Sequence, residues 1–236
     1  MRHTPDSGTP GAAPGPATGR GRRTRERILH AAAELIHARG VHATSVDDVL
    51  AAAGAGKSQF YHYFRNKEDL ARQVLALQTD RQVTEQPEIY SHLDSWQGIA
   101  AWFDRIVATM EERHCVGGCP VGSMAAEVAD REATLAPDLM EAFERFRTPL
   151  TRGLAAMRDR GDLRGDAEPE RLADFVLAAK QGGMLLAKTY KDVAPLRRAL
   201  DEALRHLRSY GPDAPTSAAR DLPLPERPAG PRNRAR

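Results

Sequence analysis

Cysteine, long apolar runs and alternating β-branched segments are scarce or absent in this chain of 236 residues. Its two cysteines cannot build a disulfide scaffold. The sequence shows neither the apolar core of a signal peptide nor a run of about 18 apolar residues that would span a membrane. We therefore expect a cytoplasmic protein with no membrane partner. Since alanine is abundant and strand-like alternation is missing, we also expect an all-α fold.

Net charge is small as well, with 34 Lys or Arg against 32 Asp or Glu. The balance is uneven along the chain, because the segment from Arg20 to Glu68 holds nine Lys or Arg and five Asp or Glu. A local basic excess is what contact with nucleic-acid phosphates requires. This segment is therefore the expected site of any such contact.

Composition divides the chain into four parts. Residues 1–19 and 211–236 contain much Pro, Gly or Arg and little that could be buried, so both are predicted to be disordered tails. Between them we expect one helical domain over residues 20–86 and a second over residues 87–210. Pro87 marks the boundary, because proline cannot continue a helix.

The stretch from Thr44 to Phe64 predicts two short helices joined by a glycine-containing turn. Thr44 or Ser45 can cap the first helix by accepting a backbone N–H bond. Gly54 suits the left-handed residue that ends it. Phe60 and Phe64, four residues apart, would share the buried face of the second helix. The side chains turned outward are then Ser58, Gln59, Tyr61 and His62.

Such a narrow, exposed polar helix fits the major groove of DNA, which indicates a helix-turn-helix. A helix over about residues 24–39, closed by Gly40, would pack against the pair. A fourth helix, capped by Asn66, would run from Lys67 to about Gln86. The residues alone also permit a helical hairpin whose aromatic groups only cover a core.

The run from Ala43 to Leu70, which includes Ala52-Ala53-Gly54-Ala55-Gly56-Lys57 and Phe60-Tyr61-His62-Tyr63-Phe64, closely resembles the DNA-binding domain of TetR-family transcriptional regulators. The resemblance extends back to Arg25. It implies an N-terminal three-helix helix-turn-helix domain, a linking fourth helix, and a C-terminal helical ligand-binding and dimerisation domain.

DNA contact is expected from two kinds of residue. Side chains on the second short helix would touch bases or phosphates, and residues around it would hold the phosphate backbone. The arginines from Arg20 to Arg27 could lie along phosphates or in the minor groove, or could be a solvated helix start. The expected contact residues are Arg23, Thr44, Ser45, Lys57, Ser58, Gln59, Tyr61, His62 and Lys67.

The second domain predicts helices over about residues 93–114, 120–131, 137–160, 169–190 and 195–209. Their aromatic and sulfur-containing side chains could line a cavity between helices, or could be ordinary core. The expected ligand-binding residues are Trp102, Phe103, Met110, Cys119, Met124, Phe143, Phe146 and Gln181.

Paired glycines inside the predicted 169–190 helix destabilise it unless another helix approaches closely. A symmetric partner would provide that approach. The resemblance implies that the last two long helices of each subunit form a four-helix dimer interface. The expected interface residues are Phe175, Gly182, Gly183, Leu186, Leu200 and Leu204.

Cys115 and Cys119, with His114 adjacent, supply too few ligands for a zinc site, and their spacing does not suit a thioredoxin-like site. We expect no metal or cofactor. Cys119 precedes a helix that Pro120 could begin, where the helix dipole favours a reactive thiolate. The alternative is that both cysteines are small, buried hydrophobic side chains without a reactive role. The Gly118–Gly122 segment is similar to one in TetR-family members resembling electrophile or quinone sensors.

These features together predict a homodimeric transcriptional regulator, a repressor released from a palindromic operator by a small-molecule effector. No converging acid–base or nucleophile set is present apart from the thiols, so we do not expect an enzyme. Two alternatives stay open. One is a thiol-based electrophile or redox sensor using Cys115 and Cys119, and the other is an architectural dimer that binds DNA without sequence preference.

Overall fold

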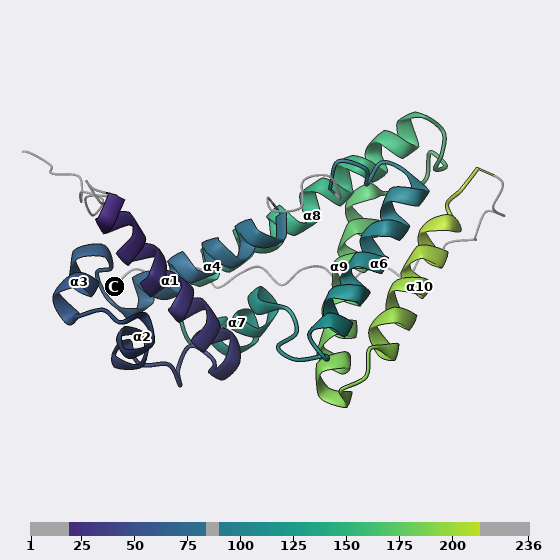
Figure 1. Cartoon of the computed structure of the whole chain (residues 1–236). Helices are drawn as coiled ribbons and strands as arrows, with labels where there is room; N and C mark the ends of the chain where they lie inside the picture. The colour runs from purple at the N-terminus through teal and green to yellow at the C-terminus, as the bar shows by residue number, and fades with distance from the viewer. Residues whose placement is uncertain (1–18, 84–89, 213–236) are drawn as a thin grey trace, which may run out of the picture.

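The computed structural model describes residues 19–83 and 90–212, which form nine helices and no strand (Figure 1). The predicted all-α fold is confirmed. A small N-terminal head of three helices is joined by a long helix to a C-terminal bundle (Figure 1). Most of the two expected tails, and the expected boundary at Pro87, lie outside the described residues.

The head consists of α1 (Gly19–Arg39), α2 (Val46–Ala53) and α3 (Lys57–Tyr63). Helix α1 begins before the expected start near Thr24, so the arginines from Arg20 to Arg27 belong to a regular helix and not to an extended arm. Arginine is a good helix former, and Thr24, within the first turns of α1, is already buried. Both facts favour the earlier start.

Local chemistry sets the bounds of α2 and α3. The Ser45 hydroxyl accepts a bond from the backbone N–H of Asp48 at 3.1 Å, and the Asp48 carboxylate accepts one from the Ser45 N–H at 3.0 Å. This capping box starts α2. Gly54 ends it with φ of +59°, in the left-handed region that favours glycine. Phe60 and Phe64 are fully buried, as predicted.

Helix α4 (Lys67–Val83) connects the head to the bundle and packs on both α1 and α8. Its start is the predicted one, because the Asn66 side-chain oxygen accepts a bond from the Asp69 N–H at 2.8 Å. Leu70, Val74 and Leu75 are buried along its inner face.

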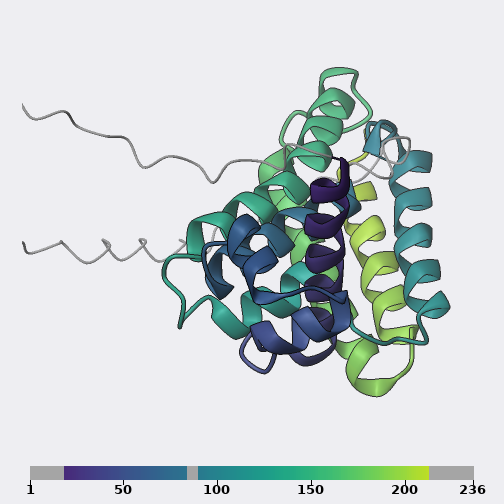
Figure 2. The same ribbon diagram turned by 60° about the vertical axis from the view of Figure 1, so that its left-hand side comes forward.

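The bundle contains α6 (Trp96–Glu112), α7 (Pro120–Val128), α8 (Ala136–Asp159), α9 (Pro169–Tyr190) and α10 (Ala194–Arg208), close to the predicted ranges. Helix α9 packs on α8 and α10, and α6 and α10 lie side by side (Figures 1 and 2). Across the described ranges, no helix has the length and apolar character needed to cross a membrane.

Two hydrophobic cores divide the molecule. One begins in the head and continues without a break through α7 into the first half of α8, where Val121, Met124 and Phe146 belong to it. The other lies among α6, the second half of α8, α9 and α10. Because the first core spans the head and part of the bundle, α7 packs on α1 and α4, and α8 packs on α4.

Candidate functional site

The outer face of α3 carries the side chains that the sequence placed there. Ser58, Gln59, Tyr61 and His62 are all exposed, and Tyr61 is 64% exposed. The buried rings of Phe60 and Phe64, 5.3 Å apart between centroids, hold this face outward from beneath. The protein therefore presents a short polar helix that nothing in its described residues covers.

Two of the expected contact residues also shape the backbone. The side-chain oxygen of Gln59 accepts a bond from the Gly56 N–H at 3.0 Å, which closes the start of α3. Ser45 is exposed, but its hydroxyl takes part in the capping box of α2. The Gln59 amide NH₂ and the rings of Tyr61 and His62 are thus better placed to meet DNA than the Ser45 hydroxyl.

Both expected lysines lie against the head. Lys57 Nζ is 3.1 Å from an Asp47 carboxylate oxygen, and both side chains are 70% exposed. Lys67 Nζ donates to the backbone oxygen of His42 at 3.2 Å. An exposed ion pair of this kind contributes roughly 0–1 kcal/mol, so a DNA phosphate can compete with Asp47 for Lys57.

Thr44, another of the expected DNA-contact residues, is buried in the head. Its side chain is only 2% exposed, and its hydroxyl donates to the backbone oxygen of Gly40 at 2.7 Å. The hydroxyl ties the end of α1 to the start of the helix-turn-helix. A buried, satisfied hydroxyl cannot reach a phosphate, so Thr44 has a structural role.

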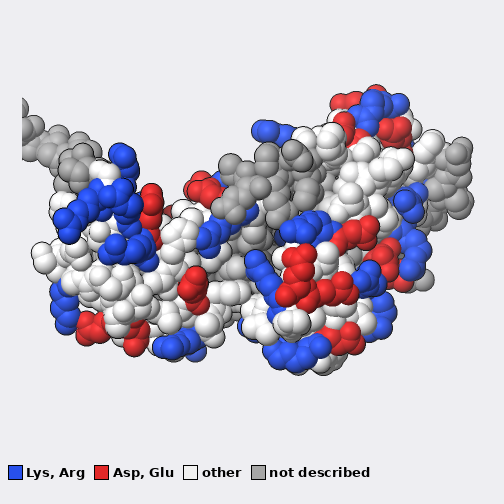
Figure 3. All heavy atoms as spheres, viewed as in Figure 1, with Lys and Arg blue, Asp and Glu red and all other residues white. Residues whose placement is uncertain are grey.

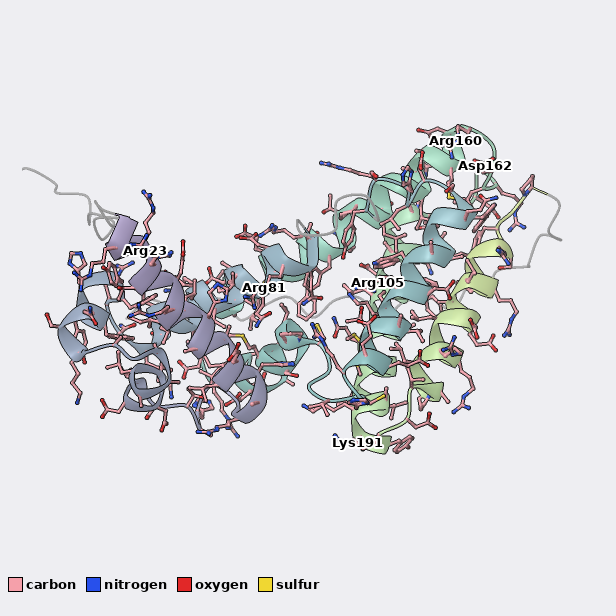
Figure 4. All side chains as sticks on the ribbon, in the orientation of Figure 1. Arg23, Arg81, Arg105, Arg160, Asp162 and Lys191 are labelled. Carbon is pink, nitrogen blue, oxygen red and sulfur yellow. The ribbon has the colours of Figure 1, made fainter. Side chains whose placement is uncertain are left out.

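The arginines of α1 fall into two groups. Arg25 donates to the Gln73 side-chain oxygen at 2.6 Å, and Arg27 donates to the Ala53 backbone oxygen at 3.3 Å, so these two fasten α1 to α4 and α2. Arg22 and Arg23 are exposed. Lys and Arg gather over the start of α1, where Arg23 also lies (Figures 3 and 4). Arg23 therefore remains available to phosphate.

A contact that the sequence did not reveal joins α7 to the head. The two carboxylate oxygens of Glu127 accept bonds from the backbone N–H groups of Val41 and His42, each at 2.7 Å. Gly40, with φ of +91°, allows the approach, since a Cβ there would meet the Glu127 carboxylate. A single glutamate on a short helix carries no sequence signal for a partner so far away along the chain.

An inner cavity of about 210 Å³ lies between α4, α6 and α9. Of the expected ligand-binding residues, only Trp102 lines it. Figure 4 shows Arg81 on α4 and Arg105 on α6, which both line this cavity. The remaining lining residues are Gln78, Gln82, Tyr90, Ile106, Thr109, Arg113, Gly118, Pro120, Lys180 and Met184.

A second cavity of about 410 Å³ lies beside the start of α7 and is lined by Cys119, Phe143 and Gln181, as expected. Cys119 is the N-cap of α7, and its sulfur accepts bonds from the Gly122 N–H at 3.3 Å and from the Gln181 amide at 3.5 Å. Cys115 and Cys119 are both free and buried. Within residues 19–83 and 90–212, no three His, Cys, Asp or Glu side chains cluster as metal ligands would.

Four expected ligand-binding residues line neither the inner nor the second cavity. Phe103 and Met110 are buried in the core of the bundle, and Met124 and Phe146 are buried in the core shared with the head. Large apolar side chains on an amphipathic helix face a core or a cavity with the same periodicity, so the sequence could not separate the two.

The outer face of α9 is apolar and exposed. Phe175, Leu185, Leu186 and Tyr190 are 43%, 62%, 43% and 65% exposed, and a Cβ on Gly182 would meet nothing within 4 Å. Phe175, Gly182 and Leu186 were expected to face a partner, and their exposure fits that prediction.

Of the other three expected interface residues, Gly183 and Leu200 are buried within the subunit, and Leu204 is partly buried. Gly183 is buried, and a Cβ there would lie 3.0 Å from the Leu196 Cα, so this glycine allows α9 and α10 of one subunit to approach closely. Leu200 is 1% exposed, and Leu204 is partly buried against the bundle core. Adjacent residues differ by about 100° around a helix, so the two glycines lie on different faces.

Comparison with known proteins agrees with this geometry. Residues 28–74 match the model described as "Bacterial regulatory proteins, tetR family", and residues 96–203 match "Tetracyclin repressor-like, C-terminal domain". The HTH-type transcriptional regulator YxaF of Bacillus subtilis is 30% identical over 185 residues, covering 73% of this chain and 89% of that protein. The HTH-type transcriptional repressor DhaR of a Mycobacterium species is 26% identical over 178 residues, covering 75% of this chain and 88% of the repressor.

A solved structure shows the same fold. The reduced form of Escherichia coli NemR aligns with a TM-score of 0.68 at 23% identity, over 80% of this chain and 97% of that one. The helix-turn-helix head, the linking helix and the helical bundle thus recur together in proteins that regulate transcription and are not enzymes. The chain therefore belongs to the TetR family of bacterial helix-turn-helix transcriptional regulators.

Proposed function

We propose that the protein is a homodimeric repressor in the cytoplasm, released from a palindromic operator by a small-molecule effector. Each subunit places α3 in a major groove, and the two-fold symmetry of the dimer is matched by the operator. The observation that carries the proposal is the position of the inner cavity, because Gln78, Arg81 and Gln82 of the linking helix α4 form one of its walls.

An occupant of this cavity acts on the head through two connections. It contacts α4 directly, and α4 packs on α1. Gly118 and Pro120, at the start of α7, also line the cavity, and α7 reaches the head through Glu127. A ligand that favours one position of α4 and α7 changes the spacing of the two α3 helices in a dimer.

The coupling between effector and operator is reciprocal by thermodynamic linkage. An effector that weakens operator binding must itself bind more weakly to the operator complex, by the same factor, which is typically about 5–150-fold. Equal effector affinity for the free and the DNA-bound protein would contradict the mechanism.

Operator recognition is tested with a double variant on the outer face of α3. Tyr61→Ala with His62→Ala removes two exposed rings without touching the core, so we expect loss of operator affinity with little loss of stability. The measurement is a competition assay against bulk DNA at fixed salt, with His92→Ala, an exposed histidine in the bundle half, as control. Equal affinity of the parent for operator and bulk DNA would favour an architectural dimer instead.

A thiol sensor is a second candidate function, supported by the surroundings of Cys119. Its sulfur faces the second cavity and accepts two N–H bonds at the start of α7, one from Gly122 and one from Gln181. The thiolate would add to the β-carbon of an α,β-unsaturated carbonyl compound, forming a C–S bond as the C=C π bond breaks, and the α-carbon, which receives that electron pair, takes a proton from water. Cys119→Ser should abolish release by N-ethylmaleimide, and Cys115→Ser should not; release that survives Cys119→Ser excludes this function.

A further inference from the structure

The inner cavity contains a buried lysine that no described carboxylate pairs with, and the group that acts on its charge is the thiol of Cys119. Lys180 on α9 is 4% exposed, and it makes no hydrogen bond or ion pair with the rest of the described chain. Its ammonium lies 5.1 Å from the ring centroid of Phe146 and 5.7 Å from that of Trp102. Cation–π contacts with two rings replace only part of the hydration that the ammonium has lost.

A second donor lacks a partner on the opposite wall. The side-chain nitrogen of Gln82, on α4, is buried and has no hydrogen-bond acceptor among the described residues. Buried polar atoms are nearly always satisfied, so an unpaired donor that lines a cavity indicates a missing acceptor. Lys180 and Gln82, on two different helices, are thus two buried donors that both lack a hydrogen-bond acceptor.

The remaining polar groups of the cavity have the same character. Arg81, Arg105 and Arg113 line it, and no Asp or Glu does so within the described ranges (Figure 4). Tyr90 stays a neutral hydroxyl, because burial raises its pKa to about 12. Arg105 is paired with Glu112 at 3.4 Å and Arg81 contacts His30, so the cationic lining that favours an anion is carried chiefly by Lys180 and Arg113.

The other part of the lining is apolar. Trp102, Ile106 and Met184 offer an aromatic face and two aliphatic surfaces beside the cationic groups. An inorganic anion would leave these surfaces without contacts. A molecule with one anionic end and a small aromatic body would satisfy both parts of the cavity.

We propose that the inner cavity binds a small aromatic carboxylate, with its carboxylate between Lys180 and Gln82 and its ring against Trp102. This inference rests on the proposed function only in treating the ligand as the effector. Binding of the anion itself follows from the charges and unpaired donors of the cavity.

The test compares acids with their own primary amides, which match them in size but carry no charge. Benzoate, salicylate and phenylacetate are each titrated against the full chain at fixed ionic strength, alongside benzamide, salicylamide, phenylacetamide and inorganic phosphate. Binding is read from tryptophan fluorescence and from the shift in melting temperature. We expect at least one acid to bind and to be preferred about tenfold or more over its amide.

Two variants locate the binding site. Lys180→Met keeps the length of the side chain and removes the charge, so the affinity for the acid should fall about 10–100-fold. Arg171→Met removes one positive charge from an exposed position on the same helix and should leave the affinity unchanged. Circular dichroism confirms that each variant is folded.

Three results would overturn the inference: no acid binds, the amides or phosphate bind as well as the acids, or acid binding survives Lys180→Met. Operator affinity is measured separately with and without the acid. Selective acid binding without operator release refutes the effector mechanism and leaves the anion site standing. Operator binding without acid binding refutes the anion site alone.

Discussion

Lys180 is the residue whose environment is least suited to its charge. Burial lowers its pKa, and the nearby Cys119 acts in the opposite direction. Replacing an unpaired buried ammonium by an apolar side chain of similar length removes a desolvation penalty. Lys180→Met is therefore expected to raise the free energy of unfolding at pH 7 by about 1 kcal/mol or more, measured by urea denaturation.

The same residue predicts a pH dependence. Because the folded-state pKa lies below the unfolded value of about 10.4, the unfolded chain binds a proton more tightly, and stability rises with pH between the two values. The parent should therefore gain more stability than Lys180→Met between pH 7 and about pH 10. Parallel curves for the two proteins would show that Lys180 is not desolvated.

The sequence held a signal for Lys180 that was missed. This residue falls on the same helical stripe as Leu172, Val176 and Ala187, all of which are buried. A lysine on an apolar stripe indicates either a pocket or a partner. Thr44 could not be assigned in the same way, because the sequence allowed either Thr44 or Ser45 to be the cap, and only the fold shows which of them is covered.

At the scale of elements, the helix bounds were largely predictable, because most are fixed by neighbouring residues. Ser45, Asn66, Pro120 and Pro169 start helices and Gly54 ends one, as expected. What the sequence could not supply was which faces of these helices meet. The Glu127 contact joins positions more than 80 residues apart, and the two cavities arise from packing between helices.

The Glu127 contact carries a prediction about coupling. Glu127→Ala leaves two N–H groups of the α1–α2 segment without an acceptor, so we expect the free energy of unfolding to fall by about 1–3 kcal/mol. We also expect the effector to release less of the protein from its operator, because α7 no longer forms hydrogen bonds with the head. The measurement is the ratio of operator affinities with and without effector. Asp201→Ala, an exposed acid on α10, is the control, and an unchanged ratio would show that α4 alone transmits the signal.

For the whole molecule, the exposed apolar face of α9 predicts self-association. Leu186→Glu introduces a charge beside Leu185 and Tyr190, so the protein should become monomeric and its operator affinity should fall steeply. Analytical ultracentrifugation gives the mass in solution. Met140→Glu on α8 replaces a residue that is 69% exposed and should leave the dimer intact. A dimer that survives Leu186→Glu would require a different interface.

The close approach of α9 and α10 at Gly183 also determines what happens when the protein is diluted. Both helices complete their mutual packing inside one chain, so in the proposed dimer we expect each separated copy to keep its fold. On the proposed function, loss of operator occupancy at low protein concentration would then measure assembly of the pair, and the amount of protein that a cell makes would set the threshold of repression.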